Sequence, residues 1–330
     1  MARAAVRQRV AAAKGWSPTE PFQSAFMPKD FKVCDNREHL YVSIMSFLSY
    51  DLYNGGFANA CWGVLLTATF PCMRHLPLSR MLLGLCMRAA RNRLLFTDNL
   101  LDFIEYSCGV AQITLALCMA GLVGAAFDKQ HSAGQNCLLP EGLALWINAI
   151  TMTKPGSLQW FGTQCSSFVP VCANNHKRCP DNYYLGDTSR AFVRDGNTQM
   201  AITSLLMMLS FWIDNVPILE QPLDSCMPQA APLTACLTFT NAMRITTYLQ
   251  VFGAPTLKPL QIWSVHTMIA TLAREKPVAL DAKSGLCKRH GDNMELFTGV
   301  PDDLTSSQAY PKGFGRAVGH MFAGHYPTRV

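Results

Sequence analysis

The chain has 330 residues, 49% hydrophobic and 15% charged, which suffices to bury a large core and argues against disorder over most of its length. Its net charge of +6 permits an anionic partner such as nucleic acid but does not require one. The 13 cysteines include no Cys-x-x-Cys pair, which argues against a disulfide framework and favours a reducing, intracellular compartment, nucleus or cytoplasm.

Residues 1–96 are expected to form a basic, helical N-terminal extension. Its first segment has four basic residues before the first acid and lacks the apolar core of a secretory signal. An Arg-rich targeting segment is the alternative, although serine is scarce there. The apolar run 41–70 is interrupted by Asp51 and by the Gly55-Gly56 pair, so we expect no membrane span in it. The basic residues before Glu20 are Arg3, Arg7, Arg9 and Lys14.

Residues 97–270 alternate short apolar runs with longer helical stretches. Strands that alternate with helices indicate βαβ units, so we predict an α/β, Rossmann-like three-layer sandwich with a mostly parallel sheet. A turn is expected at Lys154-Pro155-Gly156, and residues 271–330 are expected to be an irregular tail that can complete the domain. The predicted strands are 100–105, 122–128, 157–162, 216–222 and 260–265; the predicted helices are 113–121, 140–152 and 197–213; residues 235–249 are predicted to hold a helix and a further strand.

The stretch from Glu105 to Asp128 carries no charge between its two acidic ends. Its length alone would allow a membrane span, but the break at Gly121 divides it into a helix and a strand that are each too short. Two interpretations stay open, a buried βαβ unit without a ligand and a nucleotide-type site. In the second, the turn at Gly109 and the following helix N-terminus bind the ligand, and Asp128, 23 positions after Glu105, meets a ribose. Both acids are then expected to be exposed to that ligand.

Three later positions are candidates for chemistry. Cys165 lies in a loop of small residues after a predicted strand, where a thiolate can act as a nucleophile; an inert loop cysteine is the alternative. Glu220 lies at the end of another strand, where it either supplies a proton or faces water, and Lys258 places one cation in a loop. Four potential zinc ligands are close in the chain, but their spacing is not that of a compact zinc site, so we expect no metal. They are Cys165, Cys172, His176 and Cys179.

In their order along residues 101–265, these features resemble the motifs of the 5-cytosine DNA methyltransferase family. The first motif of that family is similar to Glu105-Tyr106-Ser107-Cys108-Gly109, then Ala120-Gly121-Leu122, then Asp128. Its catalytic Pro-Cys-Gln-x-Phe-Ser loop is similar to Gln164-Cys165-Ser166-Ser167-Phe168, and its Glu-Asn-Val motif to Glu220-Gln221-Pro222. Its Phe-Gly-x-Pro motif is similar to Phe252-Gly253-Ala254-Pro255-Thr256-Leu257-Lys258.

The resemblance implies S-adenosylmethionine as the cofactor. It would lie over the turn of the first motif, which includes Glu105 and Gly109, with Asp128 on its ribose and Asn136 near its adenine. The implied partner is nucleic acid, DNA more than RNA, from which a cytosine is flipped into the site.

The resemblance also implies a role for each candidate. The Cys165 thiolate would attack carbon 6 of the cytosine ring, Glu220 would hold and protonate the ring nitrogen, and carbon 5 would take the methyl group. Lys258 is the nearest cation of the Phe-Gly-x-Pro motif. Gln164 and Gln221 stand where the family has Pro and Asn, and little chain is left for a region that reads the target sequence. The alternative is therefore a catalytically degenerate methyltransferase fold that binds nucleic acid or a protein.

Overall fold

The computed structural model describes residues 85, 88–96, 100–254, 257–277, 287–290, 293–296 and 309–325. The chain divides into two compact units, Met1–Leu82 and Leu83–Val330, and all the described residues belong to the second. The expected N-terminal extension therefore lies almost wholly outside the described residues; residues 88–95, at its end, are helical.

A six-stranded sheet forms the centre of the second unit, in the order β2-β1-β3-β4-β6-β5. Strands β1 to β4 are parallel to one another, whereas β6 runs antiparallel to both of its neighbours. These strands are β1 (Leu101–Tyr106), β2 (Gly124–Phe127), β3 (Thr153–Phe161), β4 (Val216–Pro222), β5 (Met243–Tyr248) and β6 (Pro259–Ser264). A separate two-stranded sheet contains β7 (Cys287–His290) and β8 (Asn293–Leu296). The predicted mostly parallel sheet is confirmed.

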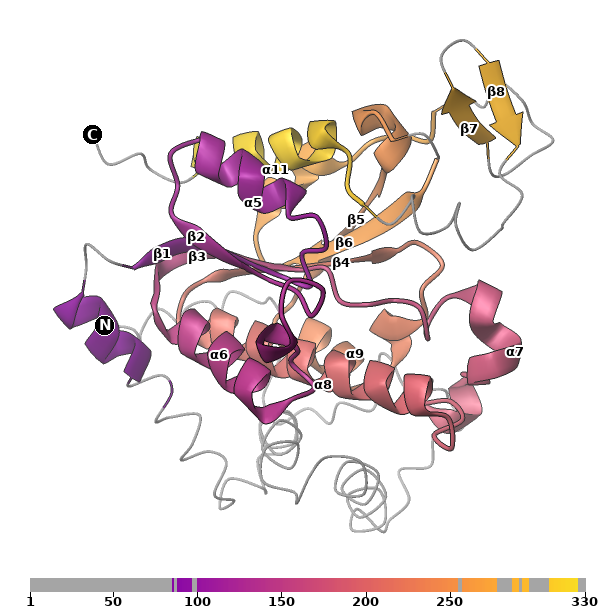
Figure 1. Cartoon of the computed structure of the whole chain (residues 1–330), viewed down its shortest axis with the longest axis horizontal. Helices are drawn as coiled ribbons and strands as arrows, with labels where there is room; N and C mark the ends of the chain where they lie inside the picture. The colour runs from indigo at the N-terminus through magenta and orange to yellow at the C-terminus, as the bar shows by residue number, and fades with distance from the viewer. Residues whose placement is uncertain are drawn as a thin grey trace. The chain divides into compact units, whose positions relative to one another are not determined.

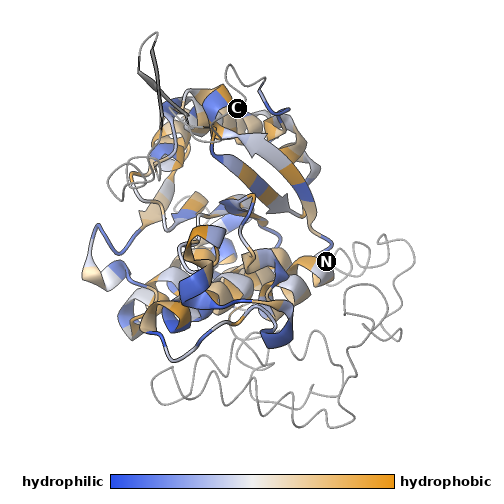
Figure 2. Ribbon diagram, turned by 90° about the vertical axis from the view of Figure 1, so that its right-hand side faces the viewer, coloured by the Kyte–Doolittle hydropathy of each residue, from blue (hydrophilic) through white to orange (hydrophobic). Residues whose placement is uncertain are grey.

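Helices cover both faces of this sheet. Figure 1 shows α5 and α11 on one face and α6, α8 and α9 on the other, and Figure 2 shows the same layers from the side. The predicted three-layer, Rossmann-like arrangement is thus confirmed. The helices are α5 (Gln112–Met119), α6 (Pro140–Thr151), α7 (Ala173–His176), α8 (Ala191–Trp212), α9 (Ala231–Phe239) and α11 (Lys312–His325). Short 3₁₀ helices are η4 (Ala133–Gln135), η5 (Pro170–Cys172), η6 (Pro180–Asn182), η7 (Met227–Gln229), η8 (Leu249–Phe252) and η9 (Thr267–Leu272).

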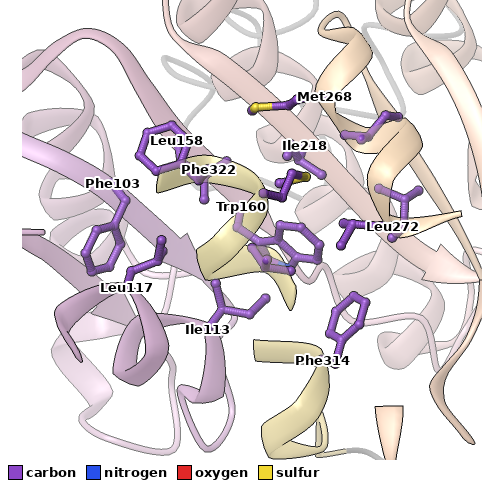
Figure 3. Packing of buried hydrophobic residues seen from close by; sticks show 14 of the residues in the cluster. Phe103, Ile113, Leu117, Leu158, Trp160, Ile218, Met268, Leu272, Phe314 and Phe322 are labelled. Atoms are coloured by element: carbon purple, nitrogen blue, oxygen red, sulfur yellow. The ribbon is translucent and has the colours of Figure 1, made fainter. Parts of the chain in front are cut away.

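The core between the sheet and the layer of α5 and α11 is built around Trp160. Because side chains alternate along a strand, Phe103 and Glu105 of β1 face this layer together with Trp160 of β3. Trp160 is fully buried and its indole meets the ring of Phe314 edge-on at 5.8 Å. Figure 3 shows the labelled members of this cluster around Trp160; they come from the sheet, from α5 and α11, and from η9. They are Phe103, Ile113, Leu117, Leu158, Ile218, Met268, Leu272, Phe314 and Phe322.

The opposite layer contains the long helix α8, which is buried along most of its 22 residues. Its apolar sequence therefore reflects burial on several sides rather than one apolar stripe. Among the described residues, no helix combines the length and the apolar character needed to cross a bilayer.

Two expectations about individual elements were wrong. Lys154-Pro155-Gly156 is not a turn but part of β3, where the register with β1 shifts and Gly156 has a φ of 79°. An ion pair of 2.7 Å between Lys154 Nζ and Asp102 Oδ1 holds this irregular segment against β1. The supposedly irregular tail contains α11, whose Phe314, Val318, Met321 and Phe322 complete the core.

Candidate functional site

The sheet has a topological switch point at the carboxyl ends of β1 and β3. From β1 the chain crosses over α5 to β2 on one side, and from β2 it crosses over α6 to β3 on the other side. The loops that follow β1 and β3 therefore diverge, which is where ligands bind in open sheets of this kind. These loops, residues 107–111 and 162–169, carry the Gly109 turn and Cys165.

The turn after β1 has an unusual backbone. Ser107, Gly109 and Ala111 all have positive φ values, of 54°, 53° and 53°, and the two residues between them do not. A positive φ is strained for Ser and Ala. The alternating sign of φ along this turn directs successive backbone N–H groups toward a common concavity that suits an anion. The backbone N–H of Gly109 donates to Asp128 Oδ2 at 2.9 Å, so an aspartate already meets one of these groups.

Asp128 ties together the loops that follow β1 and β2. Its Oδ1 accepts a 2.8 Å hydrogen bond from the N–H of Gln130, and His131 Nε2 donates to the carbonyl of Gly109 at 2.8 Å. The expectation that Asp128 meets a ligand stays a prediction, but the side chain is only 8% exposed to solvent. The reason is that backbone N–H groups on both sides draw the carboxylate inward; each oxygen keeps a further lone pair for a ligand hydroxyl.

Glu105 lies wholly buried beneath the first turn of α5. Its Oε2 accepts hydrogen bonds from the N–H and Oγ1 of Thr114, at 2.7 and 2.6 Å, and so caps a helix whose N-cap residue, Ala111, has no capping side chain. Its Oε1 has no hydrogen-bond partner among the residues that the structure describes. Burial, partly offset by the Thr114 bonds, raises the pKa of Glu105 to about 7. This acid was also expected to be exposed, and that expectation was wrong because the carboxylate is needed at the helix end.

Asn136 lies apart from these acids, at the C-cap of η4. Its Oδ1 accepts a hydrogen bond of 3.1 Å from the N–H of Leu138, which shapes the entry to α6. The neighbouring Gln135 links this segment to Asp128, since its Oε1 accepts from the Asp128 N–H at 3.0 Å. The structure therefore connects Asn136 to the site through the chain, not by a direct contact with Asp128.

Glu220 lies on the same face of the sheet as Trp160 and meets Tyr310. The Tyr310 hydroxyl donates to Glu220 Oε2 at 2.6 Å, and Trp160 Nε1 donates to the same hydroxyl at 3.4 Å. A Cβ at Gly162 would lie 3.2 Å from the Tyr310 hydroxyl and 3.2 Å from the carbonyl oxygen of Ser107. Glycine at 162 thus leaves space for the Tyr310 hydroxyl, which contacts Trp160 of β3 and Glu220 of β4.

Cys165, Glu220 and Lys258 are near enough at this edge for their charges to act on one another. The pKa of the half-buried Cys165 thiol is raised to about 11, first by burial and second by the negative charge of Glu220, while the Lys258 cation lowers it. Burial raises the pKa of Glu220, and Lys258 and the Tyr310 hydroxyl oppose that rise. The three groups therefore interact electrostatically although they lie far apart in sequence. The thiol is protonated at neutral pH.

The loop carrying Cys165 is fixed on both sides. Lys129, next to Asp128, donates from Nζ to Gln164 Oε1 at 3.1 Å. On the other side, Arg178 lies under the loop with its guanidinium 3.7 Å from the centre of the Phe168 ring. Burial lowers the pKa of Arg178 to about 10, yet all five of its N–H groups have acceptors. The acceptors are Ser167 O and Oγ, Tyr184 O, Asn197 Oδ1 and Val193 O.

The potential zinc ligands do not form a metal site. Both ring nitrogens of His176 are occupied: Nε2 lies 3.2 Å from the carbonyl of Val169, and Nδ1 accepts from the N–H of Arg178 at 2.9 Å. Within the residues that the structure describes, no three His, Cys, Asp or Glu side chains are grouped so that they could hold a metal ion.

Comparison with protein families, with curated proteins and with solved structures finds no match for this chain. The function must therefore be inferred from the geometry. Sequence reasoning missed Tyr310, His131 and Arg178 as parts of the site. Tyr310 is 90 residues from Glu220 and lies in a polar segment with no strand signal, so nothing local marked it.

Proposed function

We propose that the chain is an S-adenosylmethionine-dependent methyltransferase that acts on carbon 5 of cytosine in nucleic acid. The observation that carries the proposal is that the charges of Glu220 and Lys258 both act on the thiol of Cys165, in the loop after β3, whose Gly162 lies next to Ser107 of the Gly109 turn. A nucleophile and an acid that meet at one point beside a cofactor turn are what this chemistry requires.

The residues around the Gly109 turn fit the cofactor. Glu105 caps the N-terminus of α5 through Thr114 and so would hold the helix end beside the Gly109 turn in place for the ligand without touching it. Asp128 retains acceptor capacity for ribose hydroxyls, and Asn136 follows in the next loop. When bound, S-adenosylmethionine would supply an electrophilic methyl group.

The chain's own groups would then act on the base. Cys165 must lose its proton to form a bond from sulfur to carbon 6 of the ring. Glu220, whose pKa is raised by burial, retains its proton to higher pH than a free glutamic acid and can donate it to the ring nitrogen. Carbon 5 would then take the methyl group as its bond to the sulfonium sulfur breaks and S-adenosylhomocysteine leaves. Carbon 5 would lose its own proton to water, the bond from sulfur to carbon 6 would break to return the Cys165 thiolate, and the proton on the ring nitrogen would return to Glu220. Lys258 favours the thiolate form of Cys165 during the attack.

The test is to trap the covalent step. The protein is incubated with S-adenosylmethionine and an oligonucleotide carrying 5-fluorocytosine, whose fluorine cannot leave carbon 5 as a proton does. We expect an adduct that resists denaturation on a gel and disappears completely in Cys165→Ser. Cys118→Ser changes an exposed thiol on α5 and should form the adduct as the unmodified protein does. Absence of any adduct, together with no cofactor binding by calorimetry, would refute the proposal.

A second candidate is a degenerate methyltransferase fold that only binds nucleic acid. Two observations favour it: the Cys165 thiol has a pKa of about 11, and Tyr310 already occupies one oxygen of Glu220. A protein of this kind would bind the oligonucleotide with unchanged affinity in Cys165→Ser and would form no adduct. The trapping experiment therefore separates the two candidates.

A further inference from the structure

A surface hollow of about 510 Å³ lies between η8 and the first turns of α11. Its lining includes Phe252, Arg274, Gly313, Arg316 and His320. Two guanidinium groups and an imidazole thus meet at one place, and no acidic side chain is among the described residues that line it.

Arg274 is held in position before any ligand arrives. Its Nη1 donates to the carbonyls of Thr271 and Ala273, at 2.8 and 2.7 Å, and its guanidinium lies 5.2 Å from the centre of the Phe252 ring. No other residue that the structure describes accepts a hydrogen bond from the remaining N–H groups of this planar fork. A fork fixed in this way loses little entropy on binding an oxyanion.

Arg316 and His320 are exposed side chains that line the hollow together with Arg274. They lie four residues apart, so they occupy the same face of α11. Neither side chain has a hydrogen bond or ion pair within the part of the chain that the structure describes. Gly313 lets α11 approach η8 closely, since a Cβ there would lie 2.2 Å from the carbonyl oxygen of Phe252.

The hollow opens at the same edge of the sheet as Cys165. Strand β5 is antiparallel to β6, which is antiparallel to β4, so η8 follows β5 at the carboxyl edge of the parallel strands. Helix α11 also begins there: Gly315 packs on Gln112 and Gly319 on Ala116, so α11 and α5 run in the same direction. Aromatic contacts connect the two places, since the ring of Phe314 lies 5.2 Å from that of Phe252, edge-on, and 5.2 Å from that of Tyr310, tilted.

We propose that this hollow binds a phosphodiester group of the nucleic acid whose base enters beside Cys165. Two arginines suit the charge and the bidentate geometry of a phosphate oxygen pair. Phe252 is covered by Arg274 and Phe314, so it supports the fork and does not offer a stacking platform for a base. The phosphate group therefore contributes affinity and register, without sequence preference.

The choice of nucleic acid as the occupant rests on the proposed function, but its test does not need methyl transfer. Binding of labelled single- and double-stranded DNA and RNA oligonucleotides is followed by fluorescence anisotropy from about 50 to 200 mM salt, without cofactor. For double-stranded DNA, Arg316→Gln should weaken binding roughly fivefold to tenfold. The slope of the logarithm of the association constant against the logarithm of the salt concentration should fall in magnitude by about 0.9 for each phosphate that the variant no longer neutralises.

Two controls make the result specific. Arg316→Lys keeps the charge and should retain most of the affinity and the full salt slope. Arg244→Gln removes an exposed charge at the start of β5, on the opposite edge of the sheet, and should change neither quantity. Thermal unfolding shows whether each variant is folded, and since Gln has a helix propensity close to that of Arg, Arg316→Gln should fold.

The outcomes separate this inference from the proposed reaction. If the protein binds oligonucleotides with the expected loss in Arg316→Gln but forms no adduct, the reaction fails and the phosphate site stands. If an adduct forms but Arg316→Gln binds with unchanged affinity and slope, this inference alone is overturned. If none of the oligonucleotides binds, or if inorganic phosphate at equal ionic strength abolishes binding equally in Arg316→Gln and the unmodified protein, the hollow is not a nucleic-acid site.

Discussion

The carboxyl group of Glu105 is held in surroundings that favour its protonated form. Its pKa is about 7 in the folded protein, against 4.5 for the unperturbed group, chiefly because burial penalises the charge. The unfolded chain therefore loses this proton at lower pH than the folded chain does. Stability from this group is fully present below pH 4.5 and is lost as pH rises through 7.

This linkage can be measured with Glu105→Gln. The free energy of unfolding of the unmodified protein should fall by about 3 kcal/mol more than that of the variant between pH 4.5 and 7, from urea titrations. The Gln carbonyl can still accept the Thr114 bonds, so the variant should fold. Glu141→Gln, an exposed carboxylate in the first turn of α6, should follow the unmodified protein. An unchanged pH slope in Glu105→Gln would show that the carboxyl group is solvated.

At the scale of elements, the packing of α11 on α5 depends more on Gly315 than on Gly319. A Cβ at Gly315 would lie 2.5 Å from the carbonyl oxygen of Gln112, and this backbone atom cannot move without moving α5. At Gly319 the nearest atom, the Cβ of Ala116, is 3.6 Å away, an ordinary contact.

Alanine at these two positions should therefore act in opposite directions. Gly315→Ala should lower the free energy of unfolding by about 1–3 kcal/mol, as overpacking does. Gly319→Ala should raise it by up to about 1 kcal/mol, because alanine favours the helical backbone and the space exists. The two variants carry the same chemical change on the same helix, so each is the other's control in a urea titration. Equal destabilisation of both would contradict the packing described here.

Hydrophobic periodicity and composition predicted the strands β1, β2, β4 and β6 and the helices α5, α6 and α8, with boundaries shifted by a few residues. They failed for α11, where Gly313, Gly315, Gly319 and Gly324 give a low local helix propensity. Those glycines exist because of the close approach to α5 and η8, which is a tertiary cause that no local pattern records. The start of β3 was missed for a related reason: Pro155 and Gly156 usually mark a turn, but here the strand bulges around them.

At the scale of the whole unit, α11 is needed for the fold and not only for the site. It contributes four buried apolar side chains to the cluster around Trp160. Each large core side chain stabilises by about 2–4 kcal/mol, so their joint loss approaches the total stability of a typical domain. A chain that stops after residue 308 should therefore lose its cooperative urea transition and its near-ultraviolet circular dichroism. A chain that stops after His325 keeps the helix and should retain both; a cooperative transition in the shorter chain would contradict this role.

For the candidate site too, the sequence predicted positions along the chain but not the contacts that depend on tertiary structure. Glu105, Asp128, Cys165 and Glu220 were identified because each lies at or after a strand end, a position that sequence can reveal. Their burial was not foreseen, because it depends on which backbone N–H groups each carboxylate meets. The role of Tyr310 could not be predicted from sequence, since it depends on the space that Gly162 leaves in the folded structure.

The distance along the chain between Trp160 and Tyr310 also has a consequence for biosynthesis. The two side chains form one hydrogen-bonded group yet are 150 residues apart. At roughly 5–20 residues per second, a ribosome takes about 8 to 30 s to make the intervening chain. Throughout that interval the apolar side chains that α11 will cover lack this helix, so we expect the nascent polypeptide to expose them until α11 has been made.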